Sequence, residues 1–252
     1  MAKPLYPFNH LAAVRHLRAS AAPMAALIAR VGRYRLALEL HEHPFHSLLR
    51  AITYQQLHAT AAAAILGRIQ SQIGGGGFPA PGAILAADDV RLRSTGLSRQ
   101  KAAAVRDLAE KTLAGVVPDW NTIERLEDDA IVARLTQVRG VGAWTVQMML
   151  IFRLGRPDVL PVHDYGVQQG YQLAYRKRRL PTPRELAAAG EPWRPYRSVA
   201  SWYLWQAVRL ARLEKQLESG KDGRPSASQA KARRPLSRPA RHMQSGATAA
   251  SA

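Results

Sequence analysis

Hydrophobic residues recur at intervals of three and four along most of the chain, as they do on the buried face of an α-helix. The pattern is clear in separate runs: Leu11, Val14 and Leu17; Met24, Leu27, Ile28 and Val31; Leu48, Leu49 and Ile52; Ile65, Leu66 and Ile69; Ile131, Leu135 and Val138; Val167, Tyr171 and Leu173. No run alternates between hydrophobic and polar residues, which would indicate a β-strand. The sequence therefore predicts an all-α fold.

One stretch, residues 135–164, breaks the helical pattern twice. The first break is Gly140-Val141-Gly142. Two glycines one residue apart allow a tight turn, and amide N–H groups then point outward at the start of the next helix, where a phosphate can bind. That helix is predicted over residues 144–154. The second break is the loop after it, which leads to Asp164 at the start of another helix. A glycine hairpin and a carboxylate are thus expected one helix apart.

The composition changes after Glu218, where large hydrophobic residues almost disappear and Lys, Arg, Pro, Ser, Gly and Ala dominate. Such a segment cannot bury enough apolar surface to fold. We therefore expect a folded domain over residues 1–218 and a basic disordered tail over residues 219–252. Within the domain, Ser98 is placed to cap a helix that starts at residue 99.

The chain is strongly basic, with 36 Lys and Arg against 18 Asp and Glu and a net charge of +18. From Ser219 onward seven basic residues and one acidic residue contribute +6, which leaves +12 for residues 1–218. A folded region this basic indicates a polyanionic partner, and nucleic acid is the commonest one in a cell. The alternative is the arginine-rich codon usage of a high-GC genome.

The chain has no cysteine, which excludes disulfides, thiol catalysis, zinc ribbons and iron–sulfur clusters. No stretch is long and apolar enough to span a membrane, and the first ten residues lack the apolar core of a signal peptide. The expectation is a soluble cytoplasmic protein, associated with the nucleoid.

Several motifs occur in an order that resembles a known family. GVGAWT at residues 140–145 precedes LPVHDY at 160–165 and WRPYRS at 193–198, and ITYQQL at 52–57 and GLSRQK at 96–101 come before them. Together they resemble the helix-hairpin-helix DNA glycosylases, and most closely the DNA-3-methyladenine glycosylase II type. The resemblance covers residues 7–212. It implies two helical lobes with an active-site cleft between them, faced by the hairpin and the aspartate, and no N-terminal β-domain.

The resemblance also implies which residues bind DNA. The hairpin residues Arg139, Gly140, Val141, Gly142, Ala143 and Thr145 would hold the backbone, and the turn Gln56, Leu57 and His58 would fill the gap left by a flipped nucleotide. The alternative for that turn is an ordinary helix-to-helix connection with Leu57 in the core. Carbonyl groups of Thr136, Val138 and Val141 would hold a structural cation, and no cofactor is expected to be needed for catalysis.

Asp164 corresponds to the catalytic aspartate of that family. A carboxylate next to the sugar stabilises the oxocarbenium-like charge that develops as the base leaves. Asp164 is equally well placed to cap its own helix, a role that typically contributes about 1 kcal/mol. The two roles are compatible because capping holds the side chain still. Asp158, earlier in the loop, is the second candidate.

By resemblance, the base pocket would be lined by Trp144, Met148, Trp205 and Gln206, with His163 beside it. An aromatic face attracts a cationic alkylated purine. Family members often have Tyr where Met148 and Gln206 stand, so this pocket is expected to be less aromatic. On one helix Trp202, Tyr203 and Trp205 cannot all face the same way, so at least one should be in the core.

Related enzymes that also cut the strand have a lysine just after the hairpin, where this chain has Trp144. The expected activity is therefore monofunctional: hydrolysis of alkylated purines such as 3-methyladenine from double-stranded DNA, by a monomer, leaving an abasic site. Two alternatives remain open, a glycosylase of the same fold for deaminated or oxidised bases and a non-catalytic helix-hairpin-helix DNA-binding module.

Overall fold

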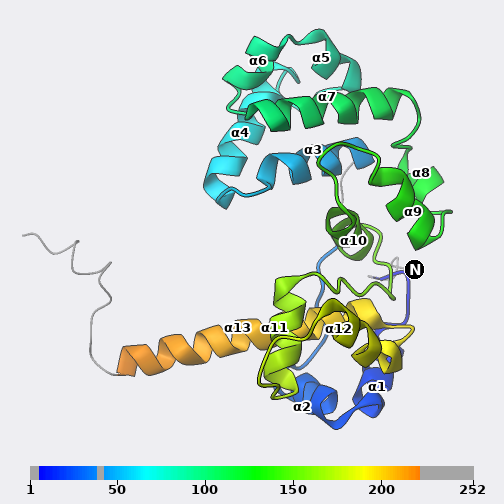
Figure 1. The fold of residues 1–252 in the computed structure, drawn as a ribbon, viewed down its shortest axis with the longest axis vertical. Helices are drawn as coiled ribbons and strands as arrows, with labels where there is room; N and C mark the ends of the chain where they lie inside the picture. The colour runs from blue at the N-terminus through cyan, green and yellow to red at the C-terminus, as the bar shows by residue number, and fades with distance from the viewer. Residues whose placement is uncertain (1–5, 39–42, 222–252) are drawn as a thin grey trace, which may run out of the picture. The chain divides into compact units, whose positions relative to one another are not determined.

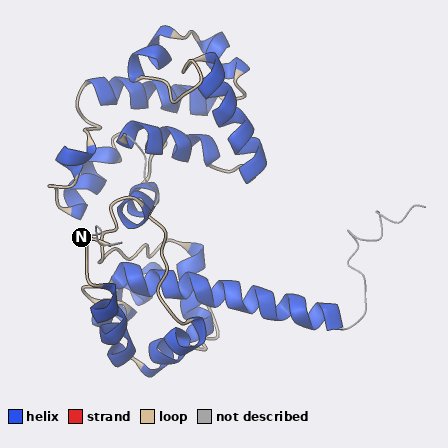
Figure 2. Cartoon of the chain, turned by 180° about the vertical axis from the view of Figure 1, so that it is seen from behind, coloured by secondary structure: helices blue, strands red, loops and turns tan. Residues whose placement is uncertain are grey.

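The computed structural model describes residues 6–38 and 43–221, and every regular element in this part of the chain is a helix. The elements are α1 (His10–Ser20), α2 (Ala22–Val31), α3 (Pro44–Tyr54), α4 (Ala59–Gln72), α5 (Pro81–Ala86), α6 (Asp89–Ser94), α7 (Arg99–Leu113), α8 (Trp120–Ile123), α9 (Asp128–Leu135), α10 (Ala143–Phe152), α11 (Tyr165–Ala174), α12 (Pro183–Ala189), the 3₁₀ helix η1 (Glu191–Trp193) and α13 (Arg197–Lys221). No strand occurs among the described residues (Figure 2). The predicted all-α fold is confirmed.

Short polar side chains fix where several of these helices begin. Ser98 accepts a hydrogen bond from the backbone N–H of Lys101 and caps α7, as predicted. Asp88 caps α6 and Thr182 closes a capping box at α12 in the same way. Each cap satisfies an amide that the first turn of a helix leaves without a partner, so these residues fix where their helices begin.

The helices pack in two groups within the first compact unit, which covers Met1–Arg209. In one group α3 contacts α4 and α7, and α7 also contacts α5 and α6 (Figure 1). In the other, α1 contacts α2 and η1, α12 contacts η1, and α11 contacts α2. Most buried hydrophobic residues of both groups belong to a single core cluster. α10 contacts α9 and adds Val146, Leu150 and Ile151 to that cluster.

The close approach of α11 and α13 depends on Gly170. A Cβ atom built on this glycine would lie 2.1 Å from the carbonyl oxygen of Leu204. One turn earlier, a Cβ atom on Gly166 would lie 2.9 Å from Cδ1 of Trp205 and 3.1 Å from Oδ1 of Asp164. Two residues without a side chain, four apart on one face of α11, therefore let the backbone of α13 come near the start of α11.

The second unit covers Leu210–Ala252, and its described part is the end of α13. That helix continues to Lys221, so residues 219–221, which were expected in the tail, are helical. The remainder of the predicted disordered tail, residues 222–252, lies outside the described residues. None of the helices described has the length and apolar character needed to cross a membrane.

Candidate active site

The carboxylate of Asp164 is fixed by three hydrogen-bond donors from three helices. Oδ1 accepts from the backbone N–H of Val167 at 2.8 Å and from the indole N–H of Trp205 at 2.8 Å. Oδ2 accepts from the indole N–H of Trp144 at 2.8 Å. The first bond caps α11, so the predicted capping role is confirmed. The two indoles orient the same carboxylate from α10 and α13, which a capping role alone does not need.

The two tryptophans differ in their surroundings. Trp144, in the first turn of α10, is 47% exposed. Trp205 is half-buried and stacks on Phe152, with 5.5 Å between ring centroids. Its neighbour Tyr203 is fully buried and donates a hydrogen bond to the carbonyl of Gly32. At least one aromatic residue of α13 is thus in the core, as the helical spacing predicted.

A pocket of about 570 Å³ opens beside Trp144. It lies between α3 and α10 and is lined by Ser47, Leu48, Arg50, Ala51, Tyr54, Gln55, Gln56, Trp144, Thr145, Met148, Met149, Phe152 and Arg153. Its volume is in the range of pockets that hold small organic ligands. The indole of Trp144 joins this pocket to Asp164, because the ring lines the pocket while its N–H binds the carboxylate.

The predicted base-pocket residues are only partly brought together. Trp144 and Met148 line the pocket, and Trp205 lies against Asp164. His163 is exposed just before the cap of α11, and Gln206 follows Trp205 on α13, about 100° further round the helix. Neither is in the pocket lining, and their role in base binding stays a prediction.

Sequence reasoning missed Tyr54 and Phe152, which line the same pocket. Both side chains are aromatic. The pocket is therefore more aromatic than was expected from the presence of Met148 where family members often have Tyr. The signal for Phe152 was present: Trp144, Met148 and Phe152 are spaced by four residues and so share one face of α10. No local signal indicated that the end of α3 would face α10.

The hairpin is held to α7 and to the turn after α3. The backbone N–H of Arg139 donates to the carboxylate of Asp107 at 2.6 Å, and the side-chain amide of Gln55 donates to the carbonyl of Gly140 at 2.8 Å. Burial would raise the pKa of Asp107, but hydrogen bonds from Arg139 and Lys111 lower it below its ordinary value. Gly140 has a φ of +77°, which only glycine adopts freely.

The hairpin residues present a largely exposed surface. Arg139, Gly140, Gly142 and Ala143 are exposed, whereas the side chains of Val141 and Thr145 are buried. No side chain caps the start of α10, so its first amides are available to an anion.

The turn after α3 is also fixed and exposed. The ammonium group of Lys101 donates to the carbonyls of Thr53 and Gln55 at 2.8 Å and 2.7 Å, and burial lowers its pKa. Gln56 has a φ of +55°, which is uncommon for a residue other than glycine. Leu57 is 41% exposed and His58 is exposed. The turn is therefore not the core connection that was the alternative to a gap-filling role.

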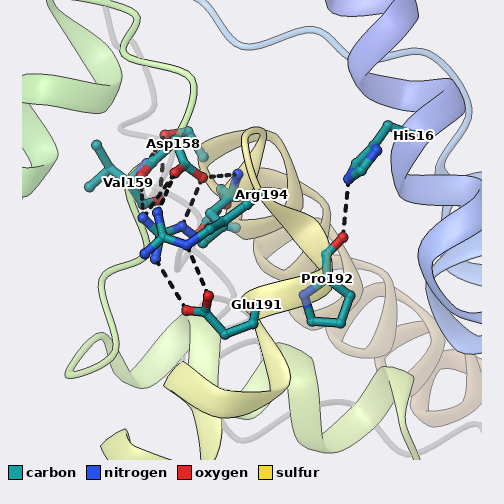
Figure 3. Close-up of polar contacts among 9 residues, drawn as sticks. His16, Asp158, Val159, Glu191, Pro192 and Arg194 are labelled. Atoms are coloured by element: carbon teal, nitrogen blue, oxygen red, sulfur yellow. Dashed lines mark hydrogen bonds and ion pairs between the residues drawn. The ribbon is translucent and has the colours of Figure 1, made fainter.

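The second candidate carboxylate, Asp158, is occupied by arginines. Its oxygens accept from the guanidinium of Arg197 at 2.8 Å and 3.0 Å. They also accept from the guanidinium of Arg194 at 2.8 Å (Figure 3). Glu191 pairs with Arg194 at 3.0 Å on the other side. Ser198 accepts a hydrogen bond from the backbone N–H of Val159 at 2.9 Å. The segment at residues 193–198 thus braces the loop that leads to Asp164.

We expect Arg197→Met to lower the free energy of unfolding by about 2 kcal/mol, because a partly buried carboxylate loses its main partner. The side chain of Arg197 is 16% exposed, and the pair it makes is shielded from water. Urea unfolding followed by circular dichroism measures the change. Arg179→Met is the matched control, since Arg179 and Glu185 form an exposed pair and little loss is expected. Equal losses in the two variants would contradict the bracing role.

Comparisons with known proteins identify the family. Residues 49–195 match the HhH-GPD superfamily of base excision DNA repair proteins. DNA-3-methyladenine glycosylase 1 of Schizosaccharomyces pombe is 38% identical over 186 residues, which are 73% of this chain and 82% of that protein.

Two solved structures are similar along most of their length. A Schizosaccharomyces pombe 3-methyladenine DNA glycosylase in complex with abasic DNA has a TM-score of 0.69 and 37% identity, and the match covers 77% of this chain and 95% of that one. A DNA-3-methyladenine glycosidase from Bacillus halodurans has a TM-score of 0.72 and 33% identity, with 82% and 95% covered. The resemblance seen in the motifs is thereby confirmed, and the chain belongs to the HhH-GPD superfamily of base excision DNA repair proteins.

Proposed function

We propose that this protein is a monofunctional DNA glycosylase that hydrolyses the N-glycosidic bond of alkylated purines such as 3-methyladenine in double-stranded DNA. The observation that carries the proposal is the carboxylate of Asp164, oriented by the indoles of Trp144 and Trp205 next to a pocket large enough for a base. The relatives are named for the same activity.

The chemistry follows from the charges at the reacting bond. An N-alkylated purine carries positive charge and is a good leaving group, so its departure needs little acid assistance. The sugar gains oxocarbenium character as the bond breaks, and a fixed carboxylate stabilises that charge without having to reorganise. Asp164 would supply this carboxylate and orient the attacking water. The three N–H donors that hold it in the structure would keep it oriented towards the sugar.

DNA binding would use the hairpin and the turn after α3. Backbone amides at the start of α10 would hold a phosphate, and the exposed Leu57, with Gln56 and His58, would occupy the gap left by the flipped nucleotide. The side chain of Gln55 joins these two surfaces through the carbonyl of Gly140. A monomer offers both surfaces, and a protein acting on chromosomal DNA would work at the nucleoid in the cytoplasm.

Incubating the protein with methylated duplex DNA tests the proposal. We expect release of 3-methyladenine and 7-methylguanine, an abasic product that breaks only in alkali, and no covalent adduct on addition of borohydride. No lysine is among the residues that line the described pocket, and a Schiff base requires one. A borohydride-trapped complex would show a lyase instead. Release of only deaminated or oxidised bases would show that these, and not alkylated purines, are the substrates. Binding without release would show a non-catalytic DNA-binding module.

We also propose a structural cation at the hairpin, held by the carbonyls of Thr136, Val138 and Val141. Carbonyl oxygens suit hard cations, and the Val138 carbonyl keeps one lone pair beside the bond it accepts from the N–H of Val141. Bound there, the ion would assist the hairpin in holding a phosphate. DNA affinity should then fall when sodium or potassium is replaced by a bulky organic cation at constant ionic strength, and base release should need no added cofactor. Equal affinities in both salts would rule the cation out.

A further inference from the structure

Two residues of the pocket, Arg50 and Tyr54, already form the kind of contact that a cationic base would make. They are four residues apart on α3, and the guanidinium carbon of Arg50 lies 4.3 Å from the centroid of the Tyr54 ring. The guanidinium also donates to the Tyr54 hydroxyl at 3.3 Å. Both side chains line the pocket beside Trp144. A flat cation therefore covers a face of an aromatic ring inside the pocket.

An alkylated purine is a flat cation too. The face of an aromatic ring attracts either one through the same electrostatic interaction. In the pocket the two cations cannot occupy one ring face together, and if Arg50 stays close by, the like charges repel each other. Arg50 is only half-buried and is attached by a flexible chain, so it can turn out towards solvent.

We propose that Tyr54 is a stacking surface for the cationic base and that Arg50 competes for it, so that the pair sets the preference of the pocket for charged over neutral bases. Arg50 has to leave the ring before any base can stack there, and its positive charge adds a repulsion that only a cationic base meets. Tyr54 favours the cationic base. This inference rests on the proposed function, because it assumes that a flipped base enters this pocket.

The test compares two duplexes that differ in the charge of one base. One carries 7-methylguanine on a 2′-fluoroarabino sugar, which resists cleavage, and the other carries its neutral 7-deaza isostere on the same sugar. The dissociation constants give the preference for charge. We expect Arg50→Met to raise this preference about tenfold and Tyr54→Leu to lower it about tenfold. Single-turnover release of natural 7-methylguanine should change in the same directions.

Three further variants complete the design. Arg93→Met removes an exposed arginine of α6 and should leave the preference for charge unchanged. Tyr54→Phe keeps the ring and loses the hydroxyl, so it should keep the wild-type preference for charge. It tests whether the ring or the hydroxyl matters even if Tyr54→Leu fails to fold. Arg50→Lys keeps the charge without the flat stacking group and should lie between wild type and Arg50→Met.

The outcomes separate this inference from the proposed function. The inference is overturned if Arg50→Met and Tyr54→Leu both show the wild-type preference for charge. This holds even if the wild-type protein releases alkylated bases. Failure of the wild type to release any base overturns the proposed function itself.

Discussion

Asp164→Asn is expected to lower the rate of base release by about a thousandfold while the protein stays folded. The asparagine keeps an oxygen that can accept from the N–H of Val167, and asparagine caps helices as well as aspartate does. Its amide group would face one of the two indole N–H donors, where an acceptor is needed. The negative charge next to the sugar is lost, and with it the stabilisation of the oxocarbenium-like transition state.

Single-turnover release of 7-methylguanine from duplex DNA gives the rate, and thermal unfolding gives the stability. Asp88→Asn is the matched control, because Asp88 caps α6 in the same way and is absent from the lining of the pocket. It should keep the wild-type rate. Near-normal turnover in Asp164→Asn would reduce Asp164 to a helix cap.

Gly170→Ala is expected to lower the free energy of unfolding by about 3 kcal/mol, at the upper end of the usual cost of overpacking. The added Cβ atom would meet the backbone carbonyl of Leu204 at 2.1 Å. Backbone cannot turn aside as a flexible side chain can, so α11 and α13 must separate. Base release should fall as well, since the indole of Trp205 would then lose its bond to Asp164.

Urea unfolding measures this loss, and Gly67→Ala is its matched control. Gly67 is exposed in the middle of α4, and a Cβ atom there would meet nothing within 4 Å. Alanine in an exposed helix interior should stabilise by about 0.5–1 kcal/mol. The two substitutions are chemically identical, and their effects on the free energy of unfolding should have opposite signs. A stability change in Gly170→Ala as small as that in Gly67→Ala would mean that the two helices tolerate a wider spacing.

Much of the fold and the central part of the site were predictable because they depend on local patterns. Spacing by three and four identified the helices, and Ser98 and Asp164 were recognised as caps from their place before a helix. The hairpin and Asp164 were one helix apart in the sequence. Each of these signals lies within a few residues, where chain geometry alone decides what is adjacent.

The features that were missed join distant parts of the chain. Gly170 in α11 meets Leu204 in α13, Asp158 meets Arg197, and Tyr54 at the end of α3 faces the pocket with α10. The local sequence around such a residue does not indicate which distant residue it will contact. Their importance comes from the packing of helices that are far apart in sequence, which a single sequence without tertiary contacts does not contain.

The anchoring of Asp164 from two sides makes the proposed chemistry depend on the assembled fold. The carboxylate accepts from Trp144 of α10 and from Trp205 of α13, so both helices must be in place before it is oriented. If Asp164 acts as proposed, a partly folded chain would therefore release no bases.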